Sequence, residues 1–191
     1  MRACDIPDDR LFALAVEFVD ICREMGALSI INDRADIAAA SGADGVHLGQ
    51  SDLPIEQARR LQLTPLIVGK RTHSLKELEK TVPLENGSVG SQLTRSPVAL
   101  PSYVSLGPVF ATPTKPTIDV AGLDYVRQGL ERLADTGVSH VAIGGITRDN
   151  VEQVLRAGAE RVAVCSAVTL APDPTDACRR LRARITKRTG E

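Results

Sequence analysis

Two aspartates that follow neighbouring apolar segments are the residues whose chemistry stands out first. The apolar run 28–31 ends at Asn32-Asp33, and the run 46–48 is soon followed by Asp52. A short helix-like segment lies between them, which gives the order strand, helix, strand. In a parallel α/β fold both carboxylates would reach the face where ligands bind. They predict a shared Mg²⁺ site completed by a phosphate. The alternative is that both aspartates only cap the following helices.

Two later segments predict a phosphate site. Residues 144–147 (GGIT) separate an apolar run from a helix-like segment, and the next apolar run ends in residues 164–167 (VCSA). Glycines let the backbone approach an anion, which then meets free N–H groups and the positive end of a helix dipole. In barrel folds the loops after the last two strands often hold phosphate. The alternative is that the small residues serve only close packing.

A third group of polar residues follows another apolar run. Thr112, Thr114 and Lys115, in the segment FATPTK, supply two hydroxyls and an ammonium group. Such a set suits a phosphate or diphosphate ligand, and a plain polar loop is the alternative. Among the histidines, His47 and His140 fit structural roles within strands.

The basic residues Lys70 and Arg71, together with His73, are expected after the third strand, where they can reach the ligand-binding face. No Ser-His-Asp or Cys-His arrangement is evident in the sequence.

The elements that would position these groups alternate along the chain. The predicted strands are 28–31, 46–48, 66–68, 103–106, 140–143 and 162–165, and the predicted helices are 8–25, 35–41, 54–61, 75–82, 124–135, 150–157 and 175–186. Ser74 and Glu77 form a capping box, and Thr147 is expected to cap a helix. This alternation predicts a parallel sheet with right-handed crossovers, either a (β/α)8 barrel or an open doubly wound sheet.

The chain length bears on that choice. A complete barrel has about 250 residues, and the chain has 191, which is too few for a complete barrel.

Residues 83–102 show no periodicity and predict a loop insertion within a single domain, 1–191.

Composition narrows the class of protein. The chain is 43% hydrophobic, carries a net charge of −1, and has 3% aromatic residues without tryptophan. These values argue against nucleic acid as a partner. No apolar run is long enough to span a membrane, so we expect no membrane partner and a cytoplasmic location. The four cysteines show no metal-ligand spacing and predict free thiols. A homo-oligomer stays open.

Taken together and in order, the motifs resemble the thiamine-phosphate synthase family. They are residues 31–54 (INDRADIAAASGADGVHLGQSDLP), 72–74 (THS), 105–115 (SLGPVFATPTK), 142–147 (AIGGIT) and 163–167 (AVCSA). The resemblance implies a (β/α)8 TIM barrel that lacks, in this chain, the first one to two strands and the first helix. It also implies a transferase of thiamine biosynthesis that joins a hydroxymethylpyrimidine diphosphate to a thiazole phosphate and releases diphosphate with Mg²⁺.

The resemblance also implies roles for individual residues. Asp33 and Asp52 would bind Mg²⁺, Asn32 would contact the pyrimidine, and Lys115 would hold the diphosphate, so that Asn32 and Lys115 are the expected catalytic residues. The residues expected to contact the thiazole phosphate are Thr112, Thr114, Gly145, Cys165 and Ser166.

The chain departs from the family pattern at two places. Arg2 matches the arginine of a Gln-x-Arg-x-Lys motif that serves the diphosphate, but Cys4 stands at the position of the lysine. Arg71 stands where the family has a serine that contacts diphosphate, so Arg71 either binds the anion more strongly or obstructs its usual pose.

Two other functions stay open. One is a thiazole tautomerase of the same superfamily, and the other is a remnant that binds thiazole phosphate without turnover. The missing strands predict a fragment of a longer chain, a partner that covers the gap, or a poorly stable product.

Overall fold

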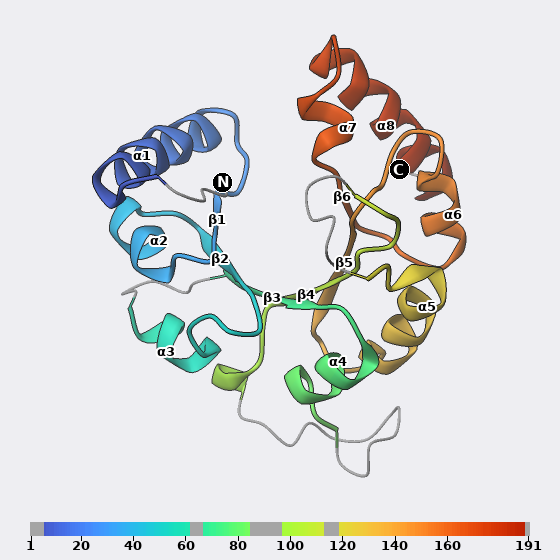
Figure 1. The fold of residues 1–191 in the computed structure, drawn as a ribbon, viewed down its shortest axis with the longest axis horizontal. Coiled ribbons are helices and arrows are strands. Elements are labelled where there is room, and N and C mark those ends of the chain that lie inside the picture. The colour runs from blue at the N-terminus through green and yellow to red at the C-terminus, as the bar shows by residue number, and fades with distance from the viewer. Residues whose placement is uncertain (1–5, 62–66, 85–96, 113–118, 190–191) are drawn as a thin grey trace. The chain divides into compact units, whose positions relative to one another are not determined.

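The computed structural model describes residues 6–61, 67–84, 97–112 and 119–189. The chain divides into two compact units, the first comprising Met1–Arg71 and Arg95–Tyr103 and the second Thr72–Thr94 and Val104–Glu191. Helices and strands alternate along each of them (Figure 1). A single domain over 1–191 stays a prediction.

The first unit is built on three parallel strands in the order β1-β2-β3. Its elements are α1 (Asp8–Glu24), β1 (Ile30–Asn32), α2 (Ala35–Ser41), β2 (Gly45–Leu48), α3 (Ile55–Arg60), β3 (Ile67–Thr72) and the 3-10 helix η2 (Pro97–Ala99). In the register, Asn32 lies opposite His47, and Leu48 lies opposite Lys70. The carboxyl ends of β1 and β2 are therefore neighbours.

Apolar spacing explains the core of the first unit. The side chains of Leu11, Ala15, Val19 and Cys22 recur three or four residues apart along α1 and are buried, which is the pattern of an amphipathic helix. The first three of them belong to one cluster with Ile31, Ala38, Val46, Leu48, Ala58 and Val68 from the strands and the other helices. This core fixes the strand ends that carry the acidic residues.

The second unit contains the remaining strands, in the order β4-β5-β6. Its elements are α4 (Leu75–Thr81), β4 (Tyr103–Leu106), α5 (Gly122–Leu133), β5 (Ser139–Ile143), α6 (Val151–Arg156), β6 (Val162–Ala163), α7 (Ser166–Thr169) and α8 (Pro174–Thr189). β5 and β6 are parallel, with Ile143 opposite Ala163. A separate buried cluster forms the core, and its largest fully buried side chains include Leu78, Leu106, Val126, Val151 and Val154.

Most predicted elements lie within two residues of the observed ones, but three differences affect the candidate site. The third strand continues to Thr72, so Lys70 and Arg71 lie within β3 rather than after it. The sixth strand ends at Ala163, and the sequence did not indicate that Ser166 begins the short helix α7. The segment that was predicted as a loop insertion contains η2, and its residues 85–96 lie outside the described part.

Two predicted caps differ in detail. The Ser74 hydroxyl accepts the Glu77 N–H at 3.3 Å, as a capping box requires, but the Glu77 carboxylate accepts the N–H of His73 at 2.8 Å. At α6 the residue directly before the helix is Asn150, which makes no side-chain cap bond, and the Thr147 hydroxyl accepts the N–H of Asp149 in the preceding turn at 3.3 Å. The Asn150 side chain folds back and its Oδ1 accepts the Thr147 N–H.

Within the described residues, none of the helices combines the length and the apolar character that crossing a membrane would require.

Candidate active site

Asp33 leaves β1 in a conformation that is unusual for a residue with a side chain. Its φ is +66°, in the left-handed region, and its N–H donates to the carbonyl of His47 at 2.8 Å. The capping residue of the following helix α2 is Arg34, and no side chain caps that helix. Asp33 therefore does not serve as a helix cap, and its carboxylate is available for another partner.

Asp52 lies in the loop after β2. Its Oδ2 accepts the N–H of Gly49 at 2.5 Å, and the capping residue of α3 is Pro54, again without a side-chain cap. The structure thus rules out the capping alternative for both aspartates. It supports the prediction that the ends of the two strands deliver both carboxylates to one place.

The guanidinium of Arg71 joins the two carboxylates. Its Nη2 lies 2.7 Å from Asp33 Oδ1 and 3.2 Å from Asp52 Oδ2, and 17% of the Arg71 side chain is exposed. The contact with Asp33 is an ion pair without hydrogen-bond geometry, and Asp33 Oδ1 is buried with no hydrogen-bond donor among the described residues. A buried carboxylate oxygen in this state is a ready ligand for a cation.

Further bonds order the loop that faces Arg71. The buried ammonium of Lys70 donates to the carbonyl of Gly49 at 2.6 Å, and the amide of Gln50 donates to the carbonyl of Arg71. A Cβ atom at Gly49 would lie 2.0 Å from Arg71 Nη2. Residue 49 is therefore a glycine at a point where the guanidinium approaches the backbone.

The two carboxylates differ in their protonation. Burial, followed by the neighbouring Asp52 carboxylate, raises the pKa of Asp33, and the opposing effect of Arg71 is smaller. Burial would also raise the pKa of Asp52, but the Gly49 amide, Asp33, Arg71 and Lys70 together lower it. Asp52 is thus the more firmly ionised member of the pair.

Asn32 lies beside the acidic pair as the last residue of β1. Its Nδ2 is buried, and no described residue accepts a hydrogen bond from it. A buried amide donor without an acceptor is costly, and a ligand that offers an acceptor would offset the cost. The predicted contact between Asn32 and a pyrimidine agrees with this observation.

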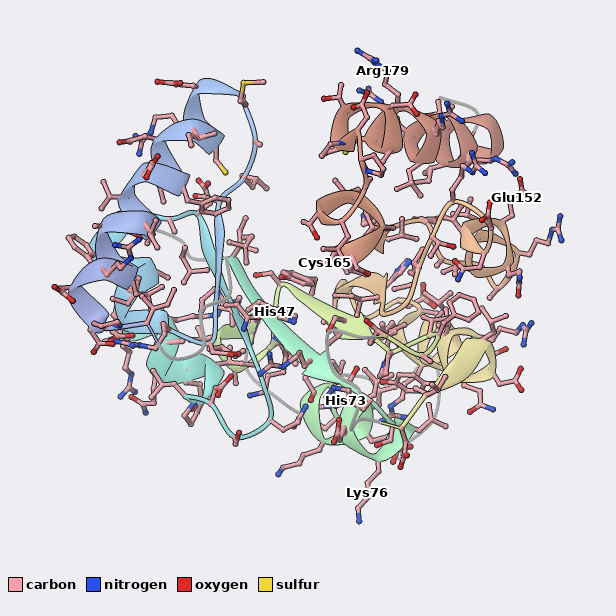
Figure 2. The ribbon with its side chains drawn as sticks, turned by 45° about the horizontal axis from the view of Figure 1, so that its top comes forward. His47, His73, Lys76, Glu152, Cys165 and Arg179 are labelled. Carbon is pink, nitrogen blue, oxygen red and sulfur yellow. The ribbon has the colours of Figure 1, made fainter. Side chains whose placement is uncertain are left out.

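The sequence did not indicate the aromatic residue that lies near this site. Tyr103 stacks on His47, with ring centroids 5.5 Å apart and an angle of 13° between the planes. Burial raises the pKa of Tyr103 to about 12. Gly69 leaves the room for this stack, because its Cβ would lie 2.2 Å from Tyr103 Cζ. The sequence did show one partner of the stack, because His47 stands out as a histidine within a predicted strand. His47 is labelled in Figure 2.

In the second unit the predicted phosphate-binding segment 144–147 packs against Phe110 and Ala111, the first two residues of the segment FATPTK. Gly144 and Gly145 have φ values of +101° and +62°. The N–H of Phe110 donates to the carbonyl of Gly144 at 3.0 Å, and a Cβ at Gly145 would lie 2.4 Å from the carbonyl oxygen of Ala111. Close packing accounts for both glycines, so they are not by themselves evidence for a phosphate.

The backbone amides of this region give better support. No hydrogen bond within the described residues engages the N–H groups of Gly145, Ile146, Ser166 or Ala167. Because β5 and β6 are paired in parallel, the segments that follow these strands lie side by side. Two adjacent sets of amide donors can bind an anion such as a phosphate.

The other predicted residues have varied positions. Cys165 precedes α7 with an exposed thiol (Figure 2), and Thr112 is half-buried at the end of a described segment. The ring of His73, also labelled in Figure 2, lies 3.1 Å from Glu77 Oε2. Arg2, Cys4, Thr114 and Lys115 lie outside the described residues, so their roles stay predictions.

Comparison with known proteins places this geometry in a family. The family model described as thiamine monophosphate synthase matches residues 1–168. The chain is 42% identical over 185 residues to the thiamine-phosphate synthase of Thermus thermophilus, which covers 97% of this chain and 81% of that protein. It is 41% identical over 174 residues to the thiamine-phosphate synthase of Gloeobacter violaceus, covering 91% of this chain. The chain spans about half of that relative, 46% of its length.

A solved structure gives the same result. The thiamine phosphate pyrophosphorylase from Pyrococcus furiosus superposes with a TM-score of 0.78 at 33% identity, covering 98% of this chain and 81% of that one. The likeness confirms an α/β fold of the TIM-barrel class for this chain. The chain belongs to the thiamine monophosphate synthase family.

Proposed function

We propose that the chain condenses a hydroxymethylpyrimidine diphosphate with a thiazole phosphate, giving thiamine phosphate and diphosphate. The observation that carries this proposal is the pair Asp33 and Asp52, which meets in the first unit after β1 and β2. Relatives that are about 40% identical to this chain are thiamine-phosphate synthases. A carboxylate pair of this kind is what a diphosphate substrate needs from a protein that binds it together with a metal ion.

The donor set fits Mg²⁺. Asp33 Oδ1 is a buried carboxylate oxygen without a hydrogen-bond donor among the described residues, and the pKa of Asp52 is lowered, so that it is ionised at neutral pH. Mg²⁺ is usually bound by one or two carboxylates, with substrate phosphates and waters completing the shell. When bound, it would neutralise the charge of the departing diphosphate.

The chain's own residues would supply alignment and charge. Asp33 and Asp52 would hold the metal ion that accompanies the diphosphate of one substrate, and Nδ2 of Asn32, which has no acceptor among the described residues, offers a hydrogen bond to the pyrimidine ring. In the second unit, the amides of Gly145 and Ser166 offer donors to the thiazole phosphate. Positioning of the two reactants lowers the barrier to their reaction without a strong base.

The test is direct. The purified chain is incubated with both substrates and MgCl₂, and thiamine phosphate and diphosphate are measured. We expect both products in equal amounts, and neither when one substrate or MgCl₂ is left out. Product formation at the full rate in EDTA would contradict the assignment of the acidic pair to a metal.

A second candidate, the binding of thiazole phosphate without turnover, is favoured by one observation, since the guanidinium of Arg71 contacts both carboxylates. Calorimetric titration with the thiazole phosphate separates the two. Binding without formation of thiamine phosphate under the assay conditions would favour the second candidate. The tautomerase would convert the thiazole phosphate alone, without a diphosphate substrate or Mg²⁺.

A further inference from the structure

We propose that the Arg71 guanidinium is a built-in counter-ion of the Asp33–Asp52 pair, and that Mg²⁺ binds this pair only by displacing it. The inference rests on the proposed function, in which the two carboxylates hold the metal, and it adds a competitor within the chain. It concerns Arg71. Within the described residues, this is the position at which the sequence differs most clearly from the pattern of the family it resembles.

The contacts place the guanidinium at the oxygens that a metal would use. One nitrogen, Nη2, faces Asp33 Oδ1 at 2.7 Å and Asp52 Oδ2 at 3.2 Å. A cation that bridged the two side chains through these oxygens would take the position that Nη2 now holds. The guanidinium and the metal therefore exclude one another at these atoms, since two cations cannot share a position between two carboxylates.

The surrounding loop is shaped around this arginine. The Gln50 side chain holds the carbonyl of Arg71, and the glycine at position 49 leaves space that a Cβ would take from Nη2. Asp52 Oδ2 accepts from Arg71 and also from the Gly49 amide. These bonds hold the backbone on both sides of the guanidinium, so its position is specified by several residues and does not depend on a single surface contact.

The local charge is already balanced. Arg71 contacts both carboxylates, and a second cation of β3, the buried ammonium of Lys70, lies at the Gly49 carbonyl of the loop that carries Asp52. A metal that enters this cluster gains little attraction unless a positive group leaves. Removal of the guanidinium should instead leave two neighbouring carboxylates with a single cation. This arrangement is unfavourable without a metal and favourable with one.

The experiment measures Mg²⁺ binding without substrate. Thermal melting and calorimetric titration are run with MgCl₂ alone, against EDTA, on the full chain and on Arg71→Ser. We expect weak binding and little change in Tm for the unaltered chain. For Arg71→Ser we expect a lower Tm in EDTA, recovery by about 5 °C in MgCl₂, and about tenfold tighter Mg²⁺ binding.

Two further variants keep the test decisive. Arg71→Gln retains most of the side-chain volume without the charge, and it should show the same gain if Arg71→Ser folds poorly. Arg59→Ser removes another half-buried arginine of the first unit, one that donates to the carbonyl of Leu100 at 3.0 Å. It should lower Tm without making Tm depend on Mg²⁺.

The outcomes separate this proposal from the proposed function. If the Arg71 variants gain no metal-dependent stability, or if the unaltered chain binds Mg²⁺ as tightly as they do, the competition is disproved. If they gain it while no thiamine phosphate is ever formed, the competition stands and the proposed reaction fails.

Discussion

At the residue scale, Asp33 shows how the site constrains the backbone. A left-handed φ is tolerated by aspartate better than by most residues with a side chain, and it directs the carboxylate of Asp33 toward Arg71. The left-handed conformation costs about 1 kcal/mol. The hydrogen bond from the Asp33 N–H to the His47 carbonyl and the ion pair of Asp33 with Arg71 offset this cost. The backbone geometry therefore agrees with a role for the carboxylate at the site.

Asp52→Asn tests the acidic pair through turnover. The substitution keeps the shape and removes the charge, so we expect the rate of thiamine phosphate formation to fall by about 100-fold. The matched control is Asp36→Asn, because Asp36 also pairs with an arginine, Arg34, but on the surface. Equal losses in both variants would show that the effect is not specific to the pair.

At the element scale, β3 is the strand on which the site depends. It supplies Arg71 to the acidic pair, Lys70 to the Gly49 carbonyl, and the gap at Gly69 to the stacked rings of His47 and Tyr103. Residues 70 and 71 alternate in direction along the strand, yet both reach the loop after β2. Lys70 donates to the carbonyl of Gly49, and Arg71 donates to Asp52, which lies further along the same loop.

Gly69→Ala should disturb this strand. The added methyl would lie 2.2 Å from Tyr103 Cζ and 2.5 Å from His47 Nδ1, so the rings must separate. We expect a loss of about 2 kcal/mol in the free energy of unfolding, measured by urea titration. Gly129→Ala is the control, since its methyl would meet the ends of the Leu106 side chain at 3.1 Å and of the Leu78 side chain at 3.5 Å. A Gly69→Ala chain as stable as the control would contradict the tight packing.

A contact between His140 of β5 and the loop before β6 predicts that the stability of the fold depends on pH. His140 Nε2 accepts the N–H of Glu160 at 3.1 Å, so the ring is neutral in the fold, and burial lowers its pKa from the ordinary 6.5. Between the lowered pKa and 6.5 the unfolded chain binds more protons, so stability falls as the pH falls through this window.

The measurement is Tm between pH 7.5 and pH 5. The decrease in Tm should be smaller for His140→Gln, which has no group that titrates in this range. An identical pH profile for both chains would show that His140 is not linked to folding.

At the scale of the whole molecule, the two buried clusters lie in different units. Leu48→Ala and Leu106→Ala each remove a fully buried side chain, one from each cluster, and we expect each to cost about 2–5 kcal/mol. Hydrogen exchange should become faster mainly at β2 in the first variant and mainly at β5 in the second. Equal acceleration everywhere in both variants would show that the chain opens only as one cooperative body.

Much of this architecture follows from the sequence. Apolar runs gave the strands to within a few residues, and Asp33 and Asp52 were placed together because parallel strands end at a common edge. The extent of β3 was missed because Lys70 and Arg71 are polar, and they lie in the strand because the acidic pair and the Gly49 carbonyl satisfy their charges.

Other features depend on contacts between distant residues and could not be read from spacing. The stack of His47 on Tyr103 joins residues 56 positions apart in the chain, and only Gly69 hints at the space it needs. Spacing also gave no sign that Asn150 Oδ1 accepts the Thr147 N–H and closes a turn ahead of α6. The role of Arg2 rests on resemblance alone, and that of Lys115 rests on resemblance and on its place beside two threonines in the segment FATPTK.

The contact between Gly49 and Arg71 has a consequence for how a distant change could reach the acidic pair. A methyl group at position 49 would meet Nη2, which is the end of a long side chain and can move aside. The guanidinium would then leave its place between Asp33 and Asp52. A substitution that adds no charge at position 49 would therefore change the charge that surrounds both carboxylates.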